Sequence, residues 1–368
     1  MPKSKLSKQE VFFGIKKILR PFLLFGAFGL VGCNQGIQAD MKRILAVEPI
    51  TCDLVNVIAP PSQPIRCLIK ANQDAHDLKL SIKQLESLND ARQIITLGPE
   101  MTPSIKNWLN KPQTLVVGVS AIKKVNGHQN ENNHLEDDHK DHHNDSYRHE
   151  DNQVGSHSKD HHDDLHDSHI HHGDDPHVWH DPTNTILISD LIYKSLESEL
   201  SDIDSKSLIL MKVRYENVKS ILSNLDEWIK EQTSSIPNNS RWLTSRHKAM
   251  EYYGEKYGLE TLSLLDYVGH SSSLRPKTLS MIINKIRENN IKVLFTEQDP
   301  PSKLLRNLSR QSRVPLSTKP IYVDGLMPKG NLVSTAVHNT CTVVSSLGGK
   351  CDKTAGQTLI NSWSELIK

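Results

Sequence analysis

The chain has 368 residues, of which 36% are apolar and 24% are charged, a balance typical of globular proteins that argues against disorder throughout. Lysine plus arginine (44) almost equals aspartate plus glutamate (43), so the charge excludes a general attraction to nucleic acid or to anionic membranes. Histidine is the anomaly, since 13 of the 19 histidines lie between His128 and His172.

The first 33 residues are predicted to be the signal peptide of a lipoprotein. Six basic residues precede an uncharged run, residues 21–32, which is too short to span a bilayer. Residues 30–33 (LVGC) resemble the lipobox of bacterial lipoproteins, in which the cysteine, here Cys33, is acylated and becomes the mature N-terminus. The alternatives are an unmodified secreted cysteine or a signal anchor. No later segment has eighteen consecutive apolar residues, so we expect membrane attachment through the lipid alone.

Four further cysteines remain in this exported chain, an even number that favours disulfides. We expect two local bridges, Cys52 to Cys67 and Cys341 to Cys351, out of three possible pairings. Closing a loop of about 15 residues stabilises by roughly 3 kcal/mol in the chain-entropy model. Buried free thiols are the alternative. A four-cysteine zinc site is disfavoured because no C-x-x-C pair occurs.

An N-terminal α/β lobe is predicted over residues 41–200. Short β-rich runs alternate with helical patterns, which indicates βαβ units around a parallel sheet. The β-rich runs are residues 43–50, 68–71, 93–98 and 114–119, and the clearest helical pattern is residues 78–91.

A histidine-rich insertion, residues 123–175, interrupts this lobe. It has so few apolar residues that burial cannot offset the entropy of ordering, and we expect a disordered surface loop. Interleaved imidazoles and carboxylates suit zinc, copper or nickel, so the loop is predicted to bind metal weakly, unless it is only a solubilising spacer. The candidate auxiliary ligands are His139, His142, His143, His161, His162, His169, His171 and His172.

A long helix within residues 201–236 is predicted to link this lobe to a second one, residues 237–368. Apolar residues from Leu208 to Ile229 follow the three-and-four spacing of one helical face. The α/β pattern then restarts, with β-rich runs at residues 241–246, 259–265, 292–297 and 320–324 and helices at 250–257, 276–289 and 302–311. We therefore expect an α/β fold of two similar lobes with parallel sheets, joined by a backbone helix, with the ligand site in the cleft between them.

Six histidines lie outside the insertion, and three of them fall at strand or loop ends. His76 lies between a predicted strand and a helix, His177 lies in DPHVWHDP before a helix, and His247 follows the strand that opens the second lobe. Such positions would line the cleft, and imidazole is a preferred zinc ligand.

These residues also carry a family resemblance. Residues 74–76 (DAH), 175–182 (DPHVWHDP), 245–247 (SRH) and 322–324 (YVD), in this order, resemble the cluster A metal receptors of ABC importers, among them periplasmic zinc-binding receptors. In that family two α/β lobes joined by a rigid helix enclose one metal ion. The resemblance implies a permease and a cytoplasmic ATPase as partners.

The resemblance implies that His76, His177, His247 and Asp324 are the metal ligands. Three alternatives stay open: His180 could replace His177, Asp324 could cap a helix, and Glu297 could approach the cleft rather than form a loop salt bridge. Ala75 stands where zinc members often have an acidic residue or proline, which leaves no acidic gate at that position.

The predicted function is capture of Zn²⁺ outside the cytoplasm and its delivery to an ABC importer. Manganese members tend to have glutamate in place of His247, and three imidazoles favour zinc over the harder manganese ion. We expect a monomer in the periplasm or on the outer face of the cytoplasmic membrane. The alternatives are a receptor for manganese or another divalent metal, a zinc-dependent hydrolase, an adhesin, or a metal buffer. The sequence contains neither H-E-x-x-H nor G-x-S-x-G, so we predict no enzyme.

Overall fold

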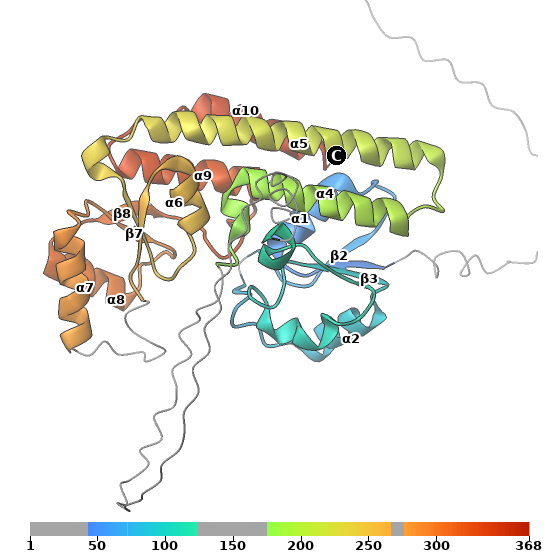
Figure 1. The fold of residues 1–368 in the computed structure, drawn as a ribbon, viewed down its shortest axis with the longest axis horizontal. Helices are drawn as coiled ribbons and strands as arrows, with labels where there is room; N and C mark the ends of the chain where they lie inside the picture. Colours follow the sequence, from blue (N-terminus) through green and yellow to red (C-terminus); the bar gives the residue numbers. More distant parts are fainter. Residues whose placement is uncertain (1–42, 72, 124–174, 266–275, 368) are drawn as a thin grey trace, which may run out of the picture. The chain divides into compact units, whose positions relative to one another are not determined.

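The computed structural model describes residues 43–71, 73–123, 175–265 and 276–367, and Figure 1 draws their fold. The predicted signal peptide with Cys33, the eight auxiliary histidines and nearly all of the insertion lie outside the described residues. None of the helices in the described ranges is both long and apolar enough to cross a membrane.

The first half is built on a four-stranded parallel sheet in the order β2-β1-β3-β4. Its strands β1 and β3 are buried along their whole length, as expected where both faces of a sheet are covered. Serine at the N-cap and glutamine three residues later form a capping box that starts α2. The elements are β1 (Ile44–Ala46), α1 (Pro49–Ile58), β2 (Ile65–Cys67), α2 (Ile82–Asp90), β3 (Gln93–Thr96), the 3₁₀ helix η2 (Pro103–Trp108) and β4 (Thr114–Val116).

The strand predicted at residues 68–71 is wrong in position, because β2 ends at Cys67. Its partner β1 ends at Ala46, and Pro49 already lies in α1. The parallel ladder therefore has no partner beyond this point, although Leu68 and Ile69 stay buried and still bond to the carbonyls of Ala46 and Val47.

A helix of 30 residues, α5 (Ser205–Ser234), follows α4 (Pro182–Glu199) and lies inside the interval predicted for a linking helix. At 1.5 Å per residue it is about 45 Å long. Its buried face, which includes Met211, Val218 and Leu225, packs on α1 and α4 of the first half and on α6, α9 and α10 of the second. This helix therefore serves as the common support of both halves (Figure 1).

The second half repeats the strand order of the first. Two parallel pairs, β5 with β6 and β7 with β8, lie side by side through β5 and β7, so the spatial order is β6-β5-β7-β8. The Phe295 N–H donates to the Thr244 hydroxyl at 3.0 Å and bridges the two pairs. The elements are β5 (Trp242–Ser245), α6 (Glu251–Tyr257), β6 (Glu260–Ser263), α7 (Pro276–Glu288), β7 (Leu294–Thr296), α8 (Lys303–Ser312) and β8 (Leu316–Pro320).

The last strand was predicted at residues 320–324, but β8 ends at Pro320. Proline has no N–H to donate to a ladder, and the partner strand β7 ends at Thr296. The Ile321 N–H makes one more bond, to the Thr296 carbonyl at 2.7 Å. The chain is then free of the sheet and carries Asp324 towards the first half.

Two C-terminal helices, which sequence reasoning did not predict, pack along α5 (Figure 1). They are α9 (Leu332–Ser346) and α10 (Lys353–Glu365). The Asp53 carboxylate on α1 accepts from the Leu332 N–H at 2.8 Å and from Trp363 Nε1 at 3.1 Å, which ties the end of the chain to the first half. Burial raises the pKa of Asp53 to about 6 against the opposing effect of these two donors.

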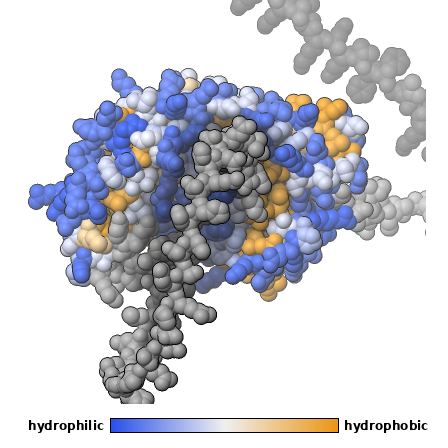
Figure 2. Space-filling view, viewed as in Figure 1, coloured by the Kyte–Doolittle hydropathy of each residue, from blue (hydrophilic) through white to orange (hydrophobic). Residues whose placement is uncertain are grey.

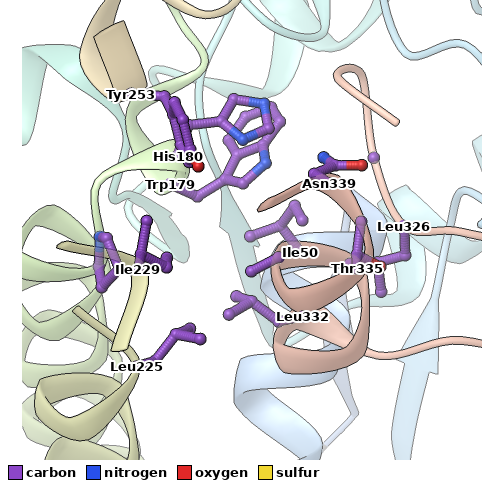
Figure 3. Close-up of a pocket in the computed structure, with 13 residues that line it drawn as sticks. Ile50, Trp179, His180, Leu225, Ile229, Tyr253, Leu326, Leu332, Thr335 and Asn339 are labelled. Carbon is purple, nitrogen blue, oxygen red and sulfur yellow. The ribbon is translucent and has the colours of Figure 1, made fainter. Parts of the chain in front are cut away.

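The junction of α1, α5 and α9 is tightly packed. Figure 3 shows Ile50, Leu225, Ile229 and Leu332 around a cavity of about 20 Å³, with Trp179 at its edge. That volume holds roughly one water molecule. The two halves therefore share one continuous core here and leave no room for a ligand.

Both predicted disulfides are present in the structure. Cys52 on α1 joins Cys67 on β2 with a Cα–Cα distance of 5.6 Å, and Cys341 on α9 joins Cys351 before α10 with a distance of 5.3 Å. Each bridge joins neighbouring elements. Because all four cysteines are in disulfides, they are neither free thiols nor ligands of a four-cysteine zinc site.

Glu48 is the N-cap of α1, and its side chain is fully buried. Its carboxylate accepts from the Thr96 and Thr102 hydroxyls at 2.7 and 2.8 Å and from the Leu97 N–H at 3.0 Å. It thus joins the end of β1 to the end of β3. Burial raises its pKa, against the effect of these hydrogen bonds.

We expect Glu48→Ala to destabilise the protein by about 3–5 kcal/mol, because several buried donors lose their acceptor together. Urea denaturation followed by circular dichroism measures the change. Glu86→Ala, at an exposed position of α2, is the matched control and should stay within about 0.5 kcal/mol of wild type. Equal stability of the two variants would contradict this role of Glu48.

Candidate metal centre

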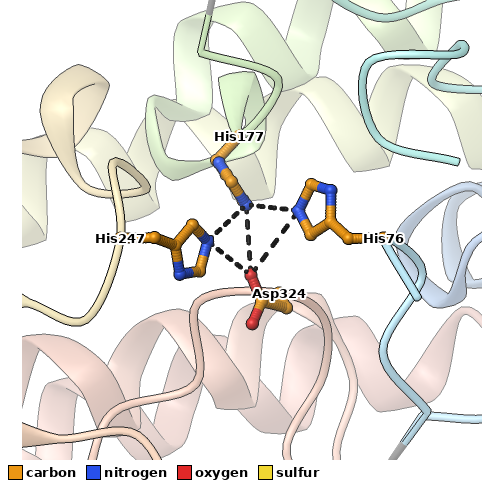
Figure 4. A group of neighbouring side chains, drawn as sticks. All are labelled: His76, His177, His247 and Asp324. Atoms are coloured by element: carbon orange, nitrogen blue, oxygen red, sulfur yellow. Dashed lines mark hydrogen bonds and ion pairs between the residues drawn. The ribbon is translucent and has the colours of Figure 1, made fainter. Parts of the chain in front are cut away.

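Four side chains from distant segments meet between the two halves (Figure 4). His76 follows β2, His177 precedes α4, His247 follows β5 and Asp324 follows β8. The carboxyl ends of parallel strands lie at one edge of a sheet, which explains why loops so far apart in sequence converge here. One potential ligand atom from each residue lies within 4.8 Å of all the others.

The spacing of these atoms matches a small four-coordinate ion. His177 Nε2 is 3.3 Å from His76 Nε2 and 3.4 Å from His247 Nε2. Asp324 Oδ1 is 2.9, 3.2 and 3.8 Å from the Nε2 atoms of His247, His177 and His76. In a tetrahedral site with metal–ligand bonds of about 2.0–2.1 Å, donor atoms lie roughly 3.3 Å apart.

Short-range hydrogen bonds fix the loops that carry the candidate ligands. Asp74 Oδ1 accepts from the His76 N–H and Asp175 Oδ1 from the His177 N–H, both at 2.9 Å. These aspartates, each two residues before a histidine, form Asx turns.

The backbone on the other side of the site is held in a similar way. The Ser245 hydroxyl donates to the His247 carbonyl at 2.6 Å. On α9, Asn339 accepts from the Tyr322 N–H at 2.9 Å and donates to its carbonyl at 2.7 Å, which holds the backbone just before Asp324. Sequence reasoning missed Asn339, because a mid-helix asparagine gives no local signal.

His177 is the central residue of the group. Its ring is buried, with Nδ1 2.7 Å from Asp175 Oδ1 and Nε2 facing Asp324. Burial alone would lower the pKa of His177, but the two carboxylates outweigh it and raise the pKa to about 9. Asp175 also fixes the tautomer, since a neutral ring with its proton on Nδ1 presents Nε2 as the donor atom to a metal.

The other three members differ in environment. Burial, followed by the charge of His177, lowers the pKa of His76. Burial would also lower the pKa of His247, but Asp324 outweighs it and raises that pKa. Burial would raise the pKa of Asp324, yet hydrogen bonds from His177 and His247 hold it far below its usual range.

His180, the alternative to His177, lies outside the group. Its Nε2 is 3.0 Å from the Val323 carbonyl, and burial together with the nearby His177 lowers its pKa to about 4. A neutral His180 donates this hydrogen bond and so supports the backbone next to Asp324.

Glu297 lies directly behind His247, at the end of β7. Its Oε2 is 3.5 Å from Arg246 Nε, which is the predicted salt bridge, and 3.9 Å from His247 Nδ1. Among the described residues, neither this oxygen nor His247 Nδ1 has a hydrogen-bond partner. Burial raises the pKa of Glu297. The glutamate therefore belongs to the surroundings of the site as well as to the loop.

A cavity of about 620 Å³ adjoins the group at Asp324. Asp74 lines it from the first half, and Arg246, Glu297 and Phe295 line it from the second. The group of four therefore faces an open space that both halves border.

The fold and this group of four side chains together define a two-lobed α/β protein of the receptor class, with a candidate metal site between its halves. A family model described as "Zinc-uptake complex component A periplasmic" matches residues 44–345. The chain belongs to this family of extracytoplasmic metal-binding receptors of ABC importers, which are not enzymes.

Individual relatives agree with this class. Metal-binding protein YtgA of Chlamydia pneumoniae is 24% identical, over 91% of this chain and 96% of its own. Manganese ABC transporter substrate-binding lipoprotein PsaA of Streptococcus pneumoniae is 20% identical, over 86% and 93%. The solved structure of the periplasmic zinc-binding protein TroA from Treponema pallidum has the same fold, with a TM-score of 0.63, 19% identity and coverage of 83% and 99%. The relatives are named for different metals, so the shared class is a divalent-metal receptor.

The raised pKa of His177 makes the stability of metal-free protein depend on pH. A histidine whose pKa is higher in the folded than in the unfolded state, here about 9 against 6.5, stabilises the folded state. This stabilisation is fully present below pH 6.5 and is lost as the pH rises through about 9. We expect chelator-treated protein to lose on the order of 3 kcal/mol of unfolding free energy across this window.

Urea denaturation at the two ends of that window measures the loss. His177→Gln should abolish most of the change in unfolding free energy between these pH values, whereas His338→Gln, a histidine that is not one of the four, should preserve it. A wild-type unfolding free energy that is constant over this pH range would contradict the assigned environment of His177.

Proposed function

We propose that this protein captures zinc outside the cytoplasm and delivers it to an ABC importer, with His76, His177, His247 and Asp324 as the ligands. The observation that carries the proposal is the set of three imidazole nitrogens and one carboxylate oxygen within 4.8 Å of one another. Zinc favours this mixture of nitrogen and oxygen donors in four-coordinate geometry. Manganese prefers oxygen ligands and higher coordination, which a site with three imidazoles serves poorly.

Capture requires the ligands to lose their protons. Each imidazole binds through Nε2 as the neutral ring, so an incoming ion must displace the Nε2 proton that His177 shares with Asp324. Asp175 then keeps the Nδ1 proton hydrogen-bonded and strengthens His177 as a donor. Acid reverses the process because protons compete for the imidazoles.

The same ligand set argues against a zinc hydrolase, since catalytic zinc keeps one position open for water whereas Asp324 supplies a fourth protein ligand. An adhesin or a simple metal buffer would need no importer, and membership of a family of importer receptors favours delivery. The partners proposed are a permease and its ATPase. The receptor itself acts as a monomer, with lobes at residues 41–200 and 237–368, tethered through acylated Cys33 outside the cytoplasmic membrane.

The histidine-rich insertion is proposed to collect zinc at low affinity and pass it to the four ligands. Calorimetric zinc titration of a variant lacking residues 123–174 should retain one tight site. In that background Asp324→Ala should weaken binding by at least about 100-fold, or about 2.7 kcal/mol. Asp299→Ala, an exposed acid that lines the adjoining cavity but lies outside the group, should leave the affinity unchanged. Loss of tight binding together with the insertion would contradict the ligand assignment.

Metal preference should depend on His247. We expect His247→Glu to lower the ratio of zinc to manganese affinity at least tenfold, because an imidazole is exchanged for an oxygen donor. Competition titrations with both ions, in the wild type and in this variant, give the ratio. His338→Glu serves as the control, and an unchanged ratio in His247→Glu would exclude His247 from the site.

A further inference from the structure

The first turns of α5 expose large apolar side chains to solvent. Ile209, Leu210 and Val213 are 65%, 41% and 51% exposed, and their spacing places them on one helical face. We call these three residues the α5 face. Figure 2 shows hydrophobic side chains gathered where α5 begins.

Basic residues flank the α5 face. Lys206 and Lys212 are exposed on the same turns. The nearest acids on the helix are engaged locally, since Asp204 accepts from the Ser207 N–H at 3.0 Å and Glu216 lies 3.9 Å from Lys219. An apolar ridge between lysines is the composition of helices that lie in a membrane interface.

Topology places this face at the edge of the first sheet where its strands begin. In a βαβ unit α1 runs back beside β1, so the C-terminal end of α1 lies near the start of β1. Arg214, next to the α5 face, donates to the carbonyls of Val57 and Asn56 at that end of α1, at 3.0 and 2.8 Å. The metal ligands follow the opposite ends of the strands.

The start of β1 is also where the chain comes from the proposed lipid anchor. Arg43 directly precedes β1 and lies only ten positions after Cys33 in the sequence. Ten residues reach at most about 35 Å when fully extended. A lipid on Cys33 would therefore hold this edge of the first half close to the bilayer.

From these observations we propose that, while the anchored protein is not docked on the importer, the α5 face rests on the lipid surface and the metal centre is directed away from the bilayer. The inference rests on the anchoring part of the proposed function and is independent of the metal. The exposed apolar side chains, the flanking lysines and the short tether all point to a lipid occupant that includes anionic headgroups.

An environment-sensitive fluorophore tests this contact. Ile209→Cys introduces a free thiol for labelling, because four native cysteines form disulfides and Cys33 carries the lipid. The full-length acylated protein is reconstituted into vesicles of phosphatidylethanolamine and phosphatidylglycerol. We expect a blue shift of the emission and quenching by spin-labelled lipids.

Ile82→Cys is the matched control. Ile82 is 76% exposed and starts α2, which runs between β2 and β3, so it lies at the edge where the strands end. Its label should keep the emission it has in water. Val213→Cys provides a second reporter on the α5 face should the first variant fold poorly.

The possible outcomes separate this inference from the metal function. Water-like emission at both α5 positions overturns it, as does a blue shift that grows with the number of proteins per vesicle and so reports a second copy. Mass spectrometry that finds Cys33 without lipid also overturns it. Zinc titration of the same samples tests the ligands separately, so a lost metal site with an intact blue shift counts only against the proposed function.

Discussion

The arrangement of the loops depends on holding three imidazoles and a carboxylate close together without strong repulsion between groups of like charge. Protonated histidines repel one another and carboxylates repel one another, but alternating them balances the two effects. His177 lies between Asp175 and Asp324, and Asp324 in turn lies between His177 and His247. This alternation raises the pKa of His177, lowers that of Asp324 and leaves a set of donors that one divalent cation can satisfy at once.

Because the four side chains come from both halves, elements that pack on both halves are needed to hold them in place. The helix α5 packs on elements from both sides, and α9 reaches from the Asp324 loop to α1. Lys256 on α6 adds ion pairs to Asp181, the N-cap of α4, at 3.3 Å and to Asp226 on α5 at 3.6 Å. Several elements therefore hold the segment between the halves that carries His177. The other candidate ligands lie on loops on either side of it.

Much of this could be predicted from sequence, because its signals are local. Strand and helix patterns gave the α/β class, a helix was expected after DPHVWHDP where α4 begins, and the spacing of cysteines indicated both disulfides. The ends of β2 and β8 were misplaced because they depend on where a partner strand stops, which the segments themselves do not encode. Glu48 and Asn339 were not predicted for the same reason, since their roles exist only through contacts with distant residues. The helices α9 and α10 do have local signals, the N-caps Asn331 and Asp352, which sequence reasoning overlooked.

The four candidate ligands are not held equally, and under the proposed function this inequality bears on how the receptor can both bind and release its ion. His177 has hydrogen bonds at its backbone N–H and at Nδ1, and its side chain is 1% exposed. His76 and His247 are 28% and 26% exposed, and the acid behind His247 is still 3.9 Å from its Nδ1. A shift of about 1 Å would bring Glu297 within hydrogen-bond distance of that nitrogen. One candidate ligand is thus fixed at the junction, whereas the two more exposed ones lie on opposite halves. Under the proposed function, an ion bound by all of them would link the two halves directly.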